Sequence, residues 1–256
     1  MNILEKRQNL HRKIELVKRK NQELSARLEQ MEQLSMVGKA WAMVAHEINN
    51  LLTPLTSYAQ MALQDSADTE LIQKALKKAV HLGSQAAEIL QQVPVLAGQK
   101  EMSKVRYSIR KLLDDAFSTM ARDFRKDGIR VVKDIPEDLY ALMDPIGMRQ
   151  VLMNLILNAR EAMLGKGGRL EIRANPHLEG LQIHISDTGC GIPPEQMPHI
   201  FEPFFTTKDG KQGQRKGHGL GLAFCKKVLE NHGGTLQVQS APGQGTVFTL
   251  WLPERS

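Results

Sequence analysis

The chain has 256 residues, of which 41% are hydrophobic, and a formal net charge of +6. This length allows one or two domains with buried cores. We find no run of about 18 apolar residues and no charged-then-apolar leader, so we expect neither a membrane span nor a signal peptide. Cys190 and Cys225 are too few for a disulfide framework or a zinc site, and they fit a reducing, cytoplasmic environment. Basic and acidic residues are interleaved, which favours an acidic protein partner over nucleic acid.

Residues 3–35 carry a heptad pattern with apolar d positions. Asn21 falls at an a position, where a polar residue favours an in-register parallel dimer. The pattern therefore predicts a dimeric coiled coil over residues 1–35, with an amphipathic helix packed on its own domain as the alternative. The d positions are Ile3, Leu10, Val17, Leu24 and Met31.

Residues 36–97 show two helical patterns separated by a polar break at 64–69. The second pattern begins near Thr69 and ends near Pro94 and Gly98. Two antiparallel helices cannot bury both apolar faces alone. We therefore expect this hairpin to pair with a second copy in a four-helix bundle, making the protein a homodimer.

His46 lies in the first of these two helical patterns. At about 100° per residue it is about 200° from both Val44 and Ile48, so it projects away from the buried face. Asn50 shares its face and Glu47 flanks it. An outward imidazole beside a carboxylate is a good nucleophile, although a solvated histidine without a role is the alternative.

Beyond a polar joint at 98–104 the pattern changes to mixed helix and strand. This predicts an α+β sandwich over residues 103–256, with helices on one face of a mixed sheet. Helices are expected over about 109–124, 145–163 and 220–231, and strands near 129–134, 138–143, 169–174, 181–186, 235–240 and 246–252.

Asn154 and Asn158 are four residues apart on the predicted helix 145–163, so their amides share one face. Amide oxygens are hard, neutral ligands that suit Mg²⁺, an ion that also bridges nucleotide phosphates. Arg160 and Glu161 follow at the end of the helix.

Asp187, Gly189 and Gly191 follow an apolar strand. The glycines permit close approach of a ligand, and Asp187 can accept a hydrogen bond from an exocyclic amine such as that of adenine. A plain turn is the alternative.

A second ligand-binding pattern spans residues 201–222. Aromatic anchors precede Lys208, a cation able to meet phosphate, and residues 209–217 have the composition of a mobile lid. Glycines 217, 219 and 221 with Leu220 then run into a helix whose N-terminal amides can hold phosphates. The spacing matches neither the dinucleotide fingerprint nor a P-loop.

In this order, the motifs resemble the asparagine, glycine and phenylalanine boxes of sensor histidine kinases, whose ATPase fold is shared with gyrase-type enzymes. The resemblance covers nearly all of residues 105–253. His46-Glu47-x-x-Asn50 is similar to the phosphoacceptor box of the same kinases and extends the match to about residue 36. The boxes are Asn154…Asn158, Asp187-x-Gly189-x-Gly191, Phe201…Phe205, Gly217-x-Gly219-x-Gly221 and Gly243-x-Gly245-Thr246.

The resemblance implies a role for each motif residue. Asn158 would ligate Mg²⁺, and Asn154 would support the phosphate side. Asp187 would contact adenine with support from Thr246. The phosphates would lie along Lys208, Gly219 and Gly221, with Arg160 contributing.

The same resemblance implies a dimeric, cytoplasmic, ATP- and Mg²⁺-dependent protein-histidine kinase. Asn154 stands where gyrase-type relatives carry a water-activating glutamate, and an amide cannot take that proton. The γ-phosphate would therefore go to His46 with Glu47 as base, and then to an aspartate on the receiver domain of a separate response regulator. Glu47 and Asn50 also resemble the phosphatase pair of the family. A gyrase-type ATPase or clamp, and a scaffold that only dimerises, are the alternatives.

Overall fold

The computed structural model describes residues 48–61, 69–96, 103–120, 123–208 and 218–254, together with residues 15, 18, 20, 44, 45 and 63. The chain divides into two compact units, Met1–Leu82 and Gly83–Ser256. The predicted coiled coil lies outside the described residues apart from three exposed helical positions, and so do His46 and Glu47. Among the helices that are described, none is both long and apolar enough to cross a membrane.

The N-terminal unit contains the first predicted hairpin helix. Residues 48–61 are helical, and the helix continues across Pro54. Leu51 is buried on this helix, whereas Asn50 is exposed. The second helix, α2 (Thr69–Leu96), begins where the polar break predicts and runs across both units.

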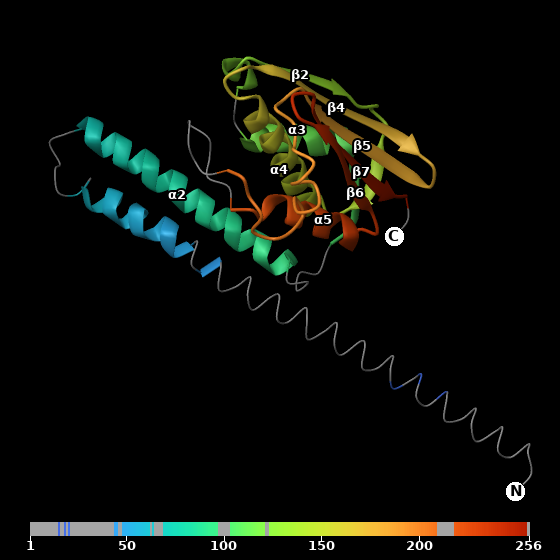
Figure 1. Cartoon of the computed structure of the whole chain (residues 1–256), viewed down its shortest axis with the longest axis horizontal. Helices are drawn as coiled ribbons and strands as arrows, with labels where there is room; N and C mark the ends of the chain where they lie inside the picture. Colours follow the sequence, from blue (N-terminus) through green and yellow to red (C-terminus); the bar gives the residue numbers. More distant parts are fainter. Residues whose placement is uncertain are drawn as a thin grey trace, which may run out of the picture. The chain divides into compact units, whose positions relative to one another are not determined.

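The C-terminal part is an α/β domain built on a five-stranded sheet (Figure 1). The strand order is β2-β4-β5-β7-β6, with β2 parallel to β4 and every other pair antiparallel. This confirms the predicted mixed sheet. The elements are β1 (Val105–Ser108), α3 (Ile109–Met120), a 3₁₀ turn η1 (Phe124–Asp127), β2 (Ile129–Asp134), β3 (Tyr140–Met143), α4 (Pro145–Met163), β4 (Gly168–His177), β5 (Gly180–Asp187), α5 (Gly221–Asn231), β6 (Thr235–Ala241) and β7 (Gly245–Pro253).

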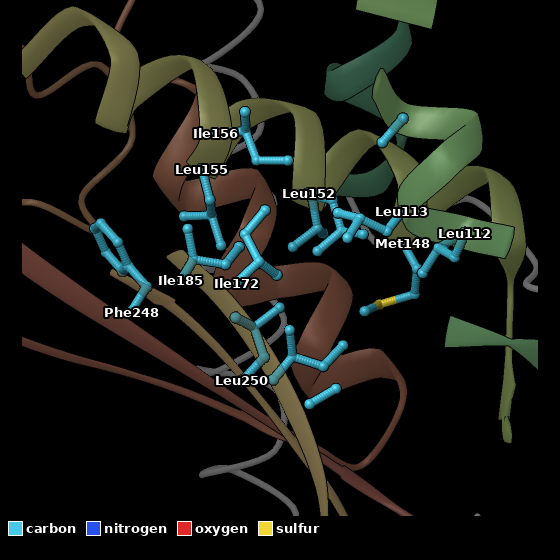
Figure 2. Packing of buried hydrophobic residues seen from close by; sticks show 14 of the residues in the cluster. Leu112, Leu113, Met148, Leu152, Leu155, Ile156, Ile172, Ile185, Phe248 and Leu250 are labelled. Atoms are coloured by element: carbon cyan, nitrogen blue, oxygen red, sulfur yellow. The ribbon is translucent and has the colours of Figure 1, made fainter. Parts of the chain in front are cut away.

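One face of the sheet packs on the helices and forms a single core (Figure 2). Along β4, Leu170 and Ile172 are fully buried while Arg169 and Arg173 are exposed, which is the alternation of a strand with one covered face. From α4, Leu152 and Leu155 meet this face. Each fully buried aliphatic side chain contributes about 1.5–3 kcal/mol relative to an exposed one. The site residues of α4 therefore project from a rigid platform.

One predicted helix ends earlier than expected, and one strand was not predicted. The helix expected over 109–124 ends at Met120, and Phe124 opens a separate 3₁₀ turn in which Asp123 accepts a hydrogen bond from the N–H of Arg125. Gly128, with φ +71°, closes that turn. Strand β1, which the periodicity does not indicate, pairs antiparallel with β3 in a small second sheet.

Candidate functional site

A cavity of about 560 Å³ opens where α4, the start of α5 and the ends of β5 and β7 meet. Its lining comes from α4 and the residues just after it, from residues 187–192, 196–208 and 218–222, from Thr246 and Phe248 of β7, and from Ile89 and Gln92 of α2. The structure brings most of the predicted site residues to this cavity. These are Asn154, Asn158, Asp187, Gly191, Lys208, Gly219, Leu220, Gly221 and Thr246.

Asp187 is the buried carboxylate of the cavity, with only 5% of its surface exposed. It ends β5, where it lies opposite Thr246 of β7. The backbone N–H of Gly189 donates to its Oδ1 at 2.8 Å, and the N–H of Thr246 also donates to it. Burial nevertheless raises the pKa of Asp187, although both hydrogen bonds favour the ionised form. A carboxylate so placed has acceptor capacity left for an amine donor in the cavity.

Thr246 is fixed by a neighbour that the motifs did not single out, Ser240. Ser240 Oγ donates to the carbonyl of Gly245 at 2.8 Å and accepts from the N–H of Ile192 at 2.8 Å. Its single proton is thus used, so the Thr246 hydroxyl donates across the 2.9 Å that separates the two oxygens. Ser240 and Thr246 face each other in the β6–β7 register, and the predicted hairpin was the signal that could have found this pair.

Asn154 ties α4 to the first residue of α5. It is buried, with 7% of its surface exposed. Its Nδ2 lies 3.4 Å from the carbonyl of Gly221, and its Oδ1 lies 3.4 Å from Nε2 of Gln150. The amide therefore links the two helices beside the cavity, and it carries no group that could act as a general base.

Asn158 and Glu161 hold a cation between them, the ammonium of Lys208. Lys208 Nζ donates to Asn158 Oδ1 at 2.7 Å and forms an ion pair with Glu161. An amide oxygen and a carboxylate oxygen that already converge on one cation are also the donor types that Mg²⁺ accepts. The residues present thus fit a divalent ion shared with bound phosphates. Glu161 lines the cavity three residues after Asn158 on the same helix face, a spacing that could have drawn attention to it.

The start of α5 is built for close backbone approach. Gly219 has φ +67°, and a Cβ at this position would overlap the backbone of Phe204. Phe204 donates its N–H to the Gly219 carbonyl at 2.8 Å and itself has φ +69°. Leu220, at the N-cap of α5, makes no side-chain capping hydrogen bond. The first amides of the helix therefore remain suited to an anionic ligand, and Gly217 lies outside the described residues.

Two predicted residues do not line the cavity. Arg160 makes two hydrogen bonds to the carboxylate of Asp127, from Nε at 2.7 Å and from a terminal nitrogen at 2.9 Å. Its charge is thus used within the domain. Gly189 packs on α4, where a Cβ would lie 2.6 Å from that of Ala162. Both residues make contacts within the domain, Arg160 with Asp127 and Gly189 with Ala162, rather than with the cavity.

Part of the remaining cavity wall is apolar, and of its side chains only Phe205 belongs to a predicted aromatic motif. It provides a surface on which a flat ring can pack, next to the carboxylate of Asp187. Its side chains are those of Ile192, Ile200, Phe205, Leu222 and Phe248.

Residues 143–256 match the model of the histidine kinase-, DNA gyrase B- and HSP90-like ATPases. Sensor histidine kinase ZraS of Escherichia coli (strain K12) is 33% identical over 242 residues, which cover 92% of this chain and 49% of ZraS. The catalytic domain of histidine kinase ThkA is 31% identical with a TM-score of 0.53, and the match covers 60% of this chain and 97% of that domain. Histidine kinase ThkA in complex with response regulator protein TrrA is 28% identical with a TM-score of 0.63, covering 87% of this chain and 63% of that one.

The domain over the C-terminal part is thus an ATPase domain of the histidine kinase and gyrase type. The chain belongs to the sensor histidine kinases. It spans about half the length of the curated relatives it matches.

Proposed function

We propose that this chain is an ATP-dependent protein-histidine kinase that phosphorylates itself on His46. The observation that carries the proposal is the cavity in which Asp187, Asn158 and the open N-terminus of α5 come together. Its volume of about 560 Å³ suits a ligand of nucleotide size.

The nucleotide would bind with its base at the apolar wall and its phosphates at the other end of the cavity. The exocyclic amine of adenine would donate to Asp187, which Thr246 helps to hold in place. The amides at the start of α5 and the ammonium of Lys208 would meet the phosphates. Asn158 would hold Mg²⁺ together with the phosphates, and the ion would neutralise the charge that develops on them.

Phosphoryl transfer would then need a nucleophile from the helical part of the chain. Neutral imidazole of His46 attacks the γ-phosphorus, so the nitrogen–phosphorus bond forms as the bond to the bridging oxygen breaks, and ADP leaves. Glu47 accepts the ring proton. Catalysis relies on positioning and charge neutralisation. Because Asn154 is an amide, direct hydrolysis of ATP is expected to be slow.

We further propose that the phosphoryl group passes to an aspartate in the receiver domain of a response regulator. The complex of the similar kinase ThkA with response regulator TrrA supports this choice of partner. Glu47 and Asn50 would also serve a phosphatase reaction on that partner. Asn50 is exposed on its helix, where a partner can reach it.

The proposed assembly is a cytoplasmic homodimer. Residues 1–35 would form its parallel coiled coil, residues 36–97 its four-helix bundle and residues 103–256 its ATP-binding domain. The apolar heptad of the first segment and the two helical patterns of the second support this arrangement.

Two variants test the kinase proposal. Asn158→Ala should reduce both Mg²⁺-dependent nucleotide binding and labelling from γ-labelled ATP by tenfold or more. Asn175→Ala, an exposed position on β4, serves as the matched control and should change neither. Labelled wild-type protein mixed with purified receiver domains should pass its label to one of them. Steady ATP hydrolysis without any phosphoprotein would instead favour the gyrase-type alternative.

A further inference from the structure

The ammonium of Lys208 contacts both Asn158 and Glu161, and all three residues line the cavity. The Lys208 ammonium lies 2.7 Å from Asn158 Oδ1 and is paired with the Glu161 carboxylate, which is only 13% exposed. The backbone N–H of Lys208 also donates to Thr206 Oγ1 at 3.2 Å, which fixes the start of its side chain. The ammonium thus occupies the oxygen that the proposed function assigns to Mg²⁺.

A bound Mg²⁺ and this ammonium would compete for Asn158. Magnesium binds oxygen at about 2.1 Å. With the ammonium at 2.7 Å from the same atom, the two cations would lie no more than about 5 Å apart. They would repel each other in a partly enclosed site. This repulsion favours the departure of Lys208 from Asn158 when the ion binds, and the phosphates are the anions that would receive it.

The ion pair with Glu161 contributes most to holding Lys208 on Asn158 in the nucleotide-free site. Glu161 supplies the only full negative charge that the described contacts of Lys208 contain. Without magnesium, the same carboxylate would keep the ammonium away from an incoming polyphosphate. With the ion bound, the ammonium would be displaced and the carboxylate would face a dication.

We propose that Glu161 is a positioning residue that holds Lys208 on Asn158 in the nucleotide-free site and thereby makes nucleotide binding dependent on Mg²⁺. This inference rests on the proposed nucleotide site. It adds the claim that an internal cation holds the metal position until the metal–nucleotide complex replaces it.

The test compares ADP affinity in excess EDTA and in excess Mg²⁺, by calorimetry on the full chain. In Glu161→Gln, the ratio of the dissociation constants in EDTA and in Mg²⁺ should fall at least fivefold, mainly because binding in EDTA becomes tighter. Glu230→Gln removes the same charge from an exposed position on α5 and should leave the ratio unchanged. An unchanged ratio in Glu161→Gln would overturn the inference while leaving the nucleotide site itself intact.

A double variant separates this mechanism from simple repulsion between Glu161 and the phosphates. If Glu161 acts through Lys208, adding Glu161→Gln to Lys208→Met should no longer alter ADP affinity in EDTA. A full effect of Glu161→Gln in the Lys208→Met background would mean direct repulsion and would refute the inference. If wild-type protein bound no ADP under either condition, both the nucleotide site and this inference would fail.

Amine labelling of the nucleotide-free protein gives a second readout. Acylation of Lys208 by an activated ester, measured by peptide mass spectrometry, should be at least threefold faster in Glu161→Gln than in wild type. Lys166, which also lines the cavity, provides an internal reference whose labelling should not change. Equal Lys208 labelling in the two proteins would contradict a held ammonium.

Discussion

The ring of His232 joins the end of α5 to the start of α4, because its Nε2 accepts a hydrogen bond from the backbone N–H of Asp144 at 2.9 Å. Its Nδ1 donates to the carbonyl of Val228 at 2.7 Å. His232 is 1% exposed, so the neutral ring is buried away from water, and both of its nitrogens have hydrogen-bond partners in the protein. The helices α4 and α5, which both line the cavity, are thereby joined at a second point besides the Asn154–Gly221 contact.

Stability should therefore fall in mild acid. Burial lowers the pKa of His232, whereas the unfolded chain protonates this ring at about pH 6.5. Below that pH the unfolded state binds a proton that the folded state does not, so the free energy of unfolding decreases as pH drops. Urea unfolding followed by Trp251 fluorescence in a Trp41→Phe background, at pH 7.5 and 5.5, measures this. His232→Gln should show a weaker pH dependence and be about 1–3 kcal/mol less stable at pH 7.5.

His177→Gln is the control for that experiment, since His177 is exposed at the end of β4. It should keep the pH dependence of the unmodified protein. Should His232→Gln keep that dependence as well, another group must be responsible for it.

The buried carboxylate of Asp187 should have two separate effects. It should strengthen nucleotide binding, and it should reduce the free energy of unfolding of the nucleotide-free protein. Replacing Asp187 with Asn removes a charged acceptor, so ADP affinity should fall about 10- to 100-fold. Because burial raises the pKa of Asp187, ADP affinity of the wild type should weaken with falling pH earlier than an ordinary aspartate would predict. The free energy of unfolding of Asp187→Asn at pH 7 should be no lower than that of wild type, since a buried charge is gone.

Asp138→Asn, at an exposed position before β3, serves as the control for Asp187→Asn. Calorimetric titration with ADP and urea unfolding supply the two readouts. Unchanged ADP affinity in Asp187→Asn would remove this residue from the base-binding role.

Arg160 should matter for stability and not for nucleotide binding. Its side chain is 8% exposed and its partner Asp127 is 19% exposed, so Arg160→Ala removes a two-hydrogen-bond ion pair from a largely buried carboxylate. Breaking such a pair costs about 3–5 kcal/mol. ADP affinity, measured at a temperature where the variant is folded, should stay within about twofold. A tenfold loss of affinity with unchanged stability would restore Arg160 as a phosphate contact.

Gly219 should tolerate no side chain. Alanine there combines an unfavourable positive φ with overlap on the Phe204 backbone, so Gly219→Ala should lower both stability and ADP affinity. Gly165 has φ +81° with open space around its Cβ position. Gly165→Ala should therefore lose only the backbone term, about 1–2 kcal/mol, and bind ADP normally. Equal effects of the two substitutions would show that the contact with Phe204 is unimportant.

Local signals explain which parts of the fold could be predicted from the sequence. Helix α4 begins and ends where Asp144, Pro145 and the apolar periodicity place it, because capping and proline geometry act within one turn. Strand β1 was missed because its four residues owe their extended conformation to pairing with β3, more than thirty residues later, rather than to a pattern of their own.

In the candidate site too, local sequence signals were informative and long-range contacts were not. Asp187 ends a strand and Asn158 lies on a helix, whereas Lys208 lies in an irregular segment, and all three line one cavity as the motifs predict. The partner of Arg160 comes from the 3₁₀ turn, an element that was not predicted from the sequence. Contacts between side chains that are distant in sequence were therefore the part that only the structure supplied.

The most direct test of the kinase proposal is the chemical stability of the label that the protein takes from γ-labelled ATP. Wild type should acquire phosphate that withstands base and is lost in acid, as expected for a nitrogen–phosphorus bond. His46→Gln should acquire none while still binding ADP with the affinity of the wild type. Acid-labile label of equal amount in His46→Gln, or base-labile label in the wild type, would contradict phosphorylation at His46.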